Sequence, residues 1–287
     1  MTDSAHDGDR RGHWIDRLSE FLPGFLQSHP ILRRFHEKAS AVLHGSVAMG
    51  IDDAFADLDL WLLVPEGDMT QLDAASETRF FELELDGKEG HLNAESVGAF
   101  SARVRGCDMD AIFQLRTAEV LADPTGAARE LVGLARRPMR PEVSLAFFRY
   151  HYVEMRGEHR SWDNPIERSE PVGALLALSK TIAHALRAAI VLDRQPYPYD
   201  KWLHRAAGAT PTGKLLLPGL ERILDLLAAD KLRAGGPESD HPIGVELRVM
   251  RQVLIDAAEA GGIRQPWLRK WWLHMDEACE GIRDIRW

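Results

Sequence analysis

Residues 40–65 read SAVLHGSVAMGIDDAFADLDLWLLVP, and the order of apolar and polar residues in this stretch decides the fold class. A short apolar run is followed by Gly45-Ser46, then by a polar stretch, and then by DLDLWLLVP, which alternates and ends at a proline. Alternation of this kind is typical of a strand with one buried face, and Gly-Ser is typical of a turn. The stretch therefore predicts a strand, a turn, a short helix and a second strand.

Gly45-Ser46 lies where the first strand gives way to the short helix. Free backbone N–H groups and the positive end of the helix dipole favour a phosphate at such a point. Glycine lets the backbone approach a ligand closely, and serine adds a hydroxyl donor. Such dipeptides are also common at ordinary turns, so a phosphate site here needs a second feature beside it.

Asp57 and Asp59 open the second strand. Because side chains alternate along a strand, the two carboxylates share one face while Leu58 and the following apolar residues at alternate positions face the core. The strand rise puts the two aspartates about 7 Å apart, close enough to share one cation. A hard divalent ion such as Mg²⁺ prefers oxygen ligands of this kind. The alternative is a pair of solvated aspartates at a strand start.

The combination of these features resembles a known signature. An apolar strand, Gly45-Ser46, ten intervening residues and then Asp57-x-Asp59 match the nucleotidyltransferase superfamily pattern, hG[GS] followed by Dh[DE]. Within the superfamily, the chain is most similar to the bacterial aminoglycoside and other antibiotic adenylyltransferases and their uncharacterised relatives. The resemblance implies an α+β protein with a mixed-sheet nucleotidyltransferase domain followed by a helical bundle domain.

The resemblance also implies a mechanism. Asp57 and Asp59 hold Mg²⁺, which bridges the oxygens of ATP or another nucleoside triphosphate and offsets charge that develops during in-line attack. Gly45 and Ser46 seat the outer phosphates. An acceptor hydroxyl attacks the α-phosphorus, and pyrophosphate leaves.

The superfamily usually supplies a third carboxylate from a neighbouring strand, as a metal ligand or as a base. Two alternating runs, residues 79–86 (RFFELELD) and 90–97 (GHLNAESV), predict a hairpin that contains the candidates. On the second run His91, Asn93 and Glu95 share a face, and Glu95 is the predicted catalytic residue. Glu82 and Glu84, which share a face on the first run, are the alternatives.

The rest of the chain predicts one further strand and a set of helices. Two short helices are expected between residues 14 and 35, separated at Pro23-Gly24, and a fifth strand is expected at 111–116. Long helices are expected at about 142–158, 171–193, 217–231, 244–260 and 266–284, with starts marked by Pro141, Pro171, Pro242 and Pro266. The predicted domains are residues 1–140, which bind nucleotide and metal, and residues 141–287, which bind the acceptor. A cleft between them is the expected ligand site.

Three residues of the helical half are candidate phosphate contacts. Lys180 lies in an otherwise apolar helical stretch, and the resemblance implies a lysine of this domain that reaches the triphosphate. Snorkelling of its charge to solvent is the alternative. Tyr199 and Lys201, in the YPYDKW segment that follows, are candidates on the same side, although this segment also fits a rigid turn packed by its aromatics.

The C-terminal tryptophans Trp267, Trp271 and Trp272 have helical spacing. They indicate core packing or a contact in a homodimer rather than a ligand stack. Cys107 and Cys279 are too few and too far apart for a disulfide framework or a zinc site, so both are expected to be reduced.

Composition favours a packed protein with small-molecule ligands. Hydrophobic residues make up 45% and charged residues 28% of the 287 residues, and the net charge is -9. An acidic field disfavours nucleic acid as a partner, whereas it suits a cationic acceptor such as an aminoglycoside. The N-terminus does not resemble a signal peptide and no run reaches about 18 apolar residues, which predicts a cytoplasmic protein without a membrane partner.

The sequence therefore predicts an Mg²⁺-dependent enzyme that transfers a nucleoside monophosphate, AMP from ATP foremost, to a hydroxyl of a small molecule. Two alternatives stay open. One is a toxin-like nucleotidyltransferase that modifies a protein, and the other is a nucleotide-binding or regulatory protein that has lost catalysis. Intact Ser46, Asp57 and Asp59 favour the catalytic interpretation.

Overall fold

The computed structural model describes residues 4–234 and 237–287, with side chains from residue 10 onward. The chain divides into two compact units, Met1–Arg137 and Pro138–Trp287. The first contains a mixed sheet with helices and the second is helical in its described residues. The α+β class expected from the sequence is confirmed, and the division lies close to the expected boundary at residue 140.

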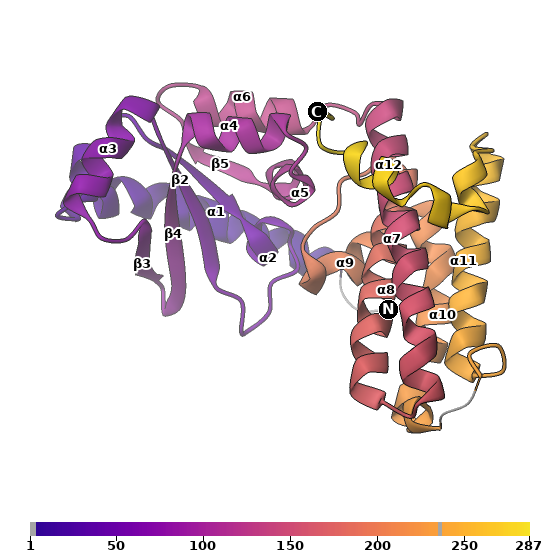
Figure 1. Ribbon diagram of the computed structural model, residues 1–287. Helices are drawn as coiled ribbons and strands as arrows, with labels where there is room; N and C mark the ends of the chain where they lie inside the picture. The colour runs from indigo at the N-terminus through magenta and orange to yellow at the C-terminus, as the bar shows by residue number, and fades with distance from the viewer. Residues whose placement is uncertain (1–3, 235–236) are drawn as a thin grey trace. The chain divides into compact units, whose positions relative to one another are not determined.

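One mixed sheet organises the first unit (Figure 1). Its strand order is β3-β4-β2-β1-β5, in which β2 and β4 are parallel and the other neighbours are antiparallel. The strands are β1 (Ser40–His44), β2 (Leu58–Val64), β3 (Phe80–Leu85), β4 (Lys88–Ser96) and β5 (Glu119–Ala122). The predicted strands on both sides of Gly45-Ser46 and the predicted hairpin are confirmed, and the short helix between β1 and β2 is α2 (Gly45–Ala48).

Helices cover both faces of this sheet. Leu58, Leu60 and Leu62 of β2 are fully buried against α1 (Ser4–Ser28) and α3 (Glu66–Ala75). On the other face Trp61 packs edge-on against Phe100, with ring centroids 4.5 Å apart. Phe100 belongs to α4 (Val97–Arg105), and this helix packs with α6 (Ala127–Ala135). The central strands β1 and β2 are therefore mostly buried, whereas on one face of β3 and β4 polar side chains reach solvent along the whole length of the strands.

The N-terminal region differs from the sequence prediction. A single helix, α1, runs through Pro23, and only a 3-10 turn, Leu32–Arg34, follows it, so the prediction of two short helices is wrong. Leu18, Leu22 and Leu26 recur every four residues and are buried. A proline inside a helix costs about 3 kcal/mol, whereas burying three leucines stabilises by roughly 1.5–3 kcal/mol each. The buried face therefore outweighs the lost hydrogen bond.

The predicted strand at 111–116 is also wrong, because these residues lie in helix α5 (Met109–Thr117). The Asp108 side chain caps the helix by accepting a hydrogen bond from the Ala111 N–H at 3.1 Å. Ala111, Ile112 and Leu115 are buried, which is helical rather than alternating spacing. The fifth strand is β5, which pairs antiparallel with β1.

The second unit is built from helices (Figure 1), among which α7 and α8 pack along each other. The helices are α7 (Pro141–Glu167), α8 (Pro171–Leu192), α9 (Asp200–Gly208), α10 (Pro211–Ala228), α11 (Pro242–Ala260) and α12 (Met275–Glu280). Pro141, Pro171 and Pro242 each stand in the first turn, as predicted. Helix α9 was not expected.

The prediction of one long helix at 266–284 is wrong. Two 3-10 turns, Pro266–Leu268 and Trp271–Leu273, precede the short α12. The Tyr152 hydroxyl donates a hydrogen bond of 2.6 Å to the Leu268 carbonyl, an acceptor that a continuing helix would need for its own backbone. Trp267 is 4% exposed and packs against Phe148 and Tyr152 of α7. Contacts with α7 therefore hold this segment in a non-helical conformation.

Helix α8 is the one helix in the described part of the chain that is long and apolar enough to cross a membrane by length and composition. Half of its most apolar window is buried inside the structure, and the helix packs against α7. A central helix of a bundle passes the same test, and these contacts account for the apolar residues of α8.

Candidate functional site

Strand pairing brings three side chains of chemical interest to one level of the first unit's sheet. Asp59 on β2 pairs with His44 on β1 and with His91 on β4. Directly opposed residues in neighbouring strands project to the same face, so these three side chains lie together. Asp57, two residues before Asp59, shares that face. The alternation predicted from the sequence is therefore present.

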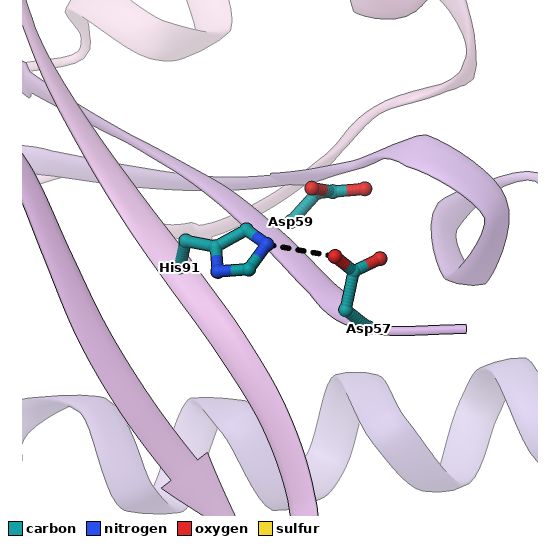
Figure 2. Close-up of side chains that lie close together, drawn as sticks. All are labelled: Asp57, Asp59 and His91. Carbon is teal, nitrogen blue, oxygen red and sulfur yellow. Dashed lines mark hydrogen bonds and ion pairs between the residues drawn. The ribbon is translucent and has the colours of Figure 1, made fainter. Parts of the chain in front are cut away.

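Asp57, Asp59 and His91 form a compact group, shown in Figure 2. Each can offer one ligand atom, and these atoms lie within 4.8 Å of one another. His91 Nε2 lies 2.7 Å from Asp57 Oδ2, a distance at which the two atoms share a hydrogen bond. The Asp57 side chain is 45% exposed and the His91 side chain 30% exposed, so the group can be reached from solvent.

Gly45 lies directly against this group. Its φ of +74° is in the left-handed region, and a Cβ built on it would lie 2.3 Å from Asp59 Oδ2. Only glycine combines this backbone conformation with so close an approach to the carboxylate. The Gly45-Ser46 turn and the Asp57-x-Asp59 pair, ten residues apart in sequence, are therefore neighbours in space.

His44, immediately before the turn, has an environment unlike that of His91. Its ring stacks on Trp61, with centroids 3.9 Å apart and an interplanar angle of 17°. Burial lowers the pKa of His44 to about 3, against a smaller opposite effect of the Asp57 charge. His44 is therefore neutral near pH 7. It lies beside the carboxylates as a neutral ring and adds no positive charge to them.

The donor set fits a divalent cation. Carboxylate oxygens suit Mg²⁺, Mn²⁺ and Ca²⁺, and an imidazole nitrogen extends the range toward Mn²⁺ and later first-row metals. His91 Nε2 and Asp57 Oδ2 share a hydrogen bond, and a cation that binds both atoms would replace that hydrogen bond. A metal held by the two aspartates and the histidine would keep its other coordination positions open for a ligand or water.

The structure does not bring Glu95, the predicted third carboxylate, into this group. Glu95 pairs across to Leu63 and forms an ion pair with Arg103 at 3.3 Å. It lies four residues beyond His91 on β4, about 13 Å along the strand. His91, which the sequence pattern places on the same face as Glu95 without marking it as a ligand, occupies the position level with Asp59.

The two alternative glutamates lie on the edge strand β3. Glu82 pairs with His91 across the β3–β4 ladder, and its exposed side chain shares the face of the metal group. Glu84 pairs with Glu89, one pair farther from the group on the same face. Glu82 is therefore the nearer of the two carboxylates to His91.

An acidic hollow of about 630 Å³ adjoins Asp57. The loop before β2, the turn between β3 and β4, and Trp14 of α1 line it. Lys88 lies over the Trp14 ring, 5.5 Å from its centroid, and donates a hydrogen bond to the Ala56 carbonyl. The charged lining residues are Asp52, Asp53, Asp57, Asp86 and Glu89 with Arg10 and Lys88. Its volume is in the range of small-molecule pockets.

The three candidate phosphate contacts of the second unit have partners within that unit. Lys180 forms an ion pair of 3.3 Å with Glu158 on α7. The Tyr199 hydroxyl accepts a hydrogen bond of 2.9 Å from the Trp202 indole, and Lys201 lies over the Trp202 ring, 4.9 Å from its centroid. Both alternatives named for them, solvent exposure of Lys180 and an aromatic turn at 197–202, agree with these contacts. Their roles as phosphate contacts stay predictions.

The sheet and the site together define an α+β protein with a candidate metal centre beside a glycine turn. No family model and no curated protein sequence matches the chain. Eleven chains of solved structures match it. One is a nucleotidyltransferase-like protein from Exiguobacterium sibiricum 255-15, with 10% sequence identity, a TM-score of 0.47, and coverage of 93% of this chain and 78% of that chain.

Proposed function

We propose that this chain is a nucleotidyltransferase that transfers a nucleoside monophosphate, AMP from ATP foremost, to a hydroxyl of a small molecule. The observation that carries the proposal is the position of Gly45 against Asp59, with Asp57 and His91 at the same point of the sheet. The residues of the sequence signature thus meet in space, and a third ligand joins them.

Asp57, Asp59 and His91 are the residues that would hold a divalent cation, Mg²⁺ or Mn²⁺. Such an ion supplies electrostatic stabilisation to the phosphate oxygens as negative charge develops on them. The N–H groups and the hydroxyl at Gly45 and Ser46 bind phosphate oxygens in this proposal. Catalysis therefore consists mainly of positioning and charge stabilisation.

The proposed transfer needs no covalent enzyme intermediate, because the acceptor attacks the nucleotide directly. The acceptor oxygen forms a bond to the α-phosphorus, the bond from that phosphorus to the bridging oxygen breaks, and pyrophosphate leaves. The acceptor hydroxyl loses its proton to a base, and we assign this role to Glu82. It is the exposed carboxylate paired with His91, whereas Glu95 is engaged by Arg103.

The acidic hollow supports a cationic acceptor. Five carboxylates line it against Arg10 and Lys88, one of them, Asp86, being paired with Arg17 at 2.8 Å. Asp57 belongs both to the hollow and to the group with Asp59 and His91. A small molecule with several amines would gain from these charges while a hydroxyl approaches the α-phosphorus. An aminoglycoside-like compound fits this description. The cytoplasmic location, the homodimer and the lack of nucleic-acid or membrane partners expected from the sequence complete the proposal.

One observation favours a second candidate, a nucleotide-binding regulatory protein without turnover. His91 stands where the superfamily usually has a carboxylate, so the group carries one negative charge fewer than the full signature implies. Binding of nucleotide with metal would persist in such a protein while transfer would not.

Pyrophosphate release from ATP tests the proposal. The full chain is assayed with Mg²⁺ or Mn²⁺ against a panel of aminoglycosides and neutral sugars, beside Asp59→Asn and the control Glu84→Gln. Release by the wild type and by the Glu84 variant, but not by the Asp59 variant, is the expected result. Release that persists in Asp59→Asn would overturn the assignment, and metal-dependent ATP binding without release would select the regulatory candidate.

A further inference from the structure

The second unit contains a pocket of about 420 Å³ that nucleotidyl transfer does not require. Arg156 and Arg160 line it from α7, Arg248 and Arg251 line it from α11, and Trp271 and Trp272 close one side. Helical spacing explains how the sequence gathers these side chains. Residues three or four apart share a helix face, so each helix presents two arginines to one space.

Two carboxylates in the pocket are already engaged by two of its arginines. Glu238 accepts a hydrogen bond of 2.6 Å from Arg248 and lies 3.1 Å from His159 Nε2. Asp163 forms an ion pair with Arg160. These pairs leave Arg156 and Arg251 without an ion pair of their own, although the Glu238 charge also acts on Arg251.

Arg156 and Arg251 lack carboxylate partners among the described residues. The Nε atom of each is buried without a hydrogen-bond partner in that part of the chain. Burial lowers the pKa of Arg251, and the charge of Arg156 lowers it further, so the two guanidinium groups repel each other. A buried N–H donor without an acceptor is unfavourable. A dianion placed between the two groups would relieve both the repulsion and the missing hydrogen bonds.

The wall of the pocket is aromatic. The Arg156 guanidinium lies 5.6 Å from the centroid of the Trp271 ring, and Trp271 meets Trp272 edge-on with centroids 6.2 Å apart. Trp272 is 55% exposed although it is a large apolar side chain. A flat ring on a ligand would pack on this wall while its charged end meets the arginines.

A metal ion does not suit this place. His159, Asp163 and Glu238 have ligand atoms within 4.8 Å of one another, as the group around Asp59 does. Here, however, four guanidinium groups line the same space and two of them already bind the carboxylates. The field of the pocket repels a cation and attracts an anion.

We propose that this pocket binds a small phosphate monoester that carries an aromatic ring. A phosphate monoester is close to a dianion near pH 7, and its oxygens match the forked donors of arginine. The inference does not depend on the proposed transferase activity, because all the residues that carry it lie within Pro138–Trp287.

Calorimetric titration of the full chain with phenyl phosphate tests the proposal. The titration is made in the presence of EDTA, so that no divalent cation supports binding at Asp57 and Asp59. Binding of phenyl phosphate more tightly than inorganic phosphate, and more tightly than benzoate, is the expected result. No binding of phenyl phosphate at millimolar concentration would overturn the proposal, as would equal affinity for benzoate.

The variant Arg251→Gln tests whether phenyl phosphate binds in this pocket. We expect phenyl phosphate affinity to fall at least about ten-fold, while the Tm of the anion-free protein stays the same or rises, because one of two repelling cations is removed. A residue with only a structural role would lower the Tm. If the Gln variant does not fold, Arg251→Lys, which keeps the charge and loses the fork, is expected to weaken binding as well.

Arg222→Gln is the matched control. Arg222 is an arginine of the same unit that pairs with Glu246 at 2.8 Å and does not line the pocket. Its replacement is expected to leave the affinity unchanged. If Arg251→Gln and Arg222→Gln weaken binding equally, the anion is attracted by the general charge of the unit, and the proposal of a specific pocket is overturned.

Discussion

Two groups among the residues that the structure describes combine carboxylates with a histidine, and they differ in what surrounds them. Asp57, Asp59 and His91 in the sheet unit adjoin a hollow rich in carboxylates. His159, Asp163 and Glu238 in the helical unit lie in a pocket lined by four arginines. The donor atoms are alike in kind and spacing, but the surrounding charge has opposite sign. Neighbouring charge therefore decides that the first group suits a cation and the second pocket suits an anion.

The largest effect is expected for the sheet group. Asp59→Asn should lower transfer at least about a thousand-fold, because a metal ligand that acts on the developing phosphate charge is lost. The Tm should not fall, since removal of one of two neighbouring like charges relieves repulsion. Initial rates of pyrophosphate release and thermal unfolding measure the two effects. Equal loss in Glu84→Gln would mean that the general charge of this face, rather than the group, is responsible.

Each group has a glycine against one of its carboxylates, and the two glycines differ in backbone conformation. A Cβ built on Gly244 would lie 2.8 Å from Glu238 Oε1 at an ordinary φ, whereas Gly45 combines its contact with Asp59 with a φ of +74°. Gly45→Ala should destabilise the protein by about 1–3 kcal/mol and weaken metal binding, because the new Cβ meets Asp59 Oδ2 at a residue with positive φ. Chemical denaturation and metal titration measure these effects.

Gly87→Ala is the matched control for Gly45. Gly87 has a φ of +78°, but nothing lies within 4 Å of a Cβ built there. It should therefore show only the cost of the backbone conformation and retain metal affinity. Equal losses in the two variants would show that contact with Asp59 has no effect of its own.

Acid should destabilise the helical unit at a histidine pair in which His151 is buried and His184 is half-buried. His184 Nδ1 lies 3.0 Å from His151 Nδ1, and burial followed by the Arg187 charge lowers the pKa of His184 to about 4. The unfolded chain takes up the proton first, near pH 6.5, so this stability is full above that pH and is lost as the pH falls toward 4. Between pH 7 and pH 5 the loss should be about 1–2 kcal/mol.

Thermal unfolding at the two pH values checks this expectation. His184→Gln should lose less stability than the wild type on acidification, while His204→Gln, which removes an exposed histidine of the same unit, should follow the wild type. If His184→Gln and the wild type lose the same stability between pH 7 and pH 5, the His151–His184 pair is not a source of acid sensitivity.

The smallest effect is expected at Lys180. Lys180 forms an ion pair with Glu158, but its side chain is 63% exposed. Lys180→Ala should therefore change the free energy of unfolding by less than about 1 kcal/mol. Calorimetry with ATP distinguishes its two interpretations. A fall in ATP affinity of about three-fold or more would support the phosphate contact predicted from the sequence, and unaltered affinity would leave Lys180 as a surface partner of Glu158.

Local patterns explain what the sequence predicted correctly. Asp57 and Asp59 share a face because alternation is a property of one strand, and Pro141, Pro171 and Pro242 mark helix starts because their effect is confined to one turn. These features need no knowledge of distant residues.

The third ligand could not be predicted this way, because it depends on pairing between strands distant in sequence. His91, Asn93 and Glu95 look equivalent along β4, and only the register that sets His91 opposite Asp59 and Glu95 opposite Leu63 separates them. A short apolar run such as 111–116 was ambiguous for a similar reason. The Asp108 cap and the burial of Leu115 decided in favour of helix.

Calorimetric titration of the full chain with Mn²⁺ in the presence of ATP tests whether Asp57, Asp59 and His91 form a metal centre. We expect metal binding by the wild type, at least about a ten-fold weaker affinity in Asp59→Asn and His91→Ala, and wild-type affinity in Glu95→Gln and in His159→Ala. Undiminished binding in Asp59→Asn and His91→Ala, or a loss in His159→Ala, would contradict this expectation.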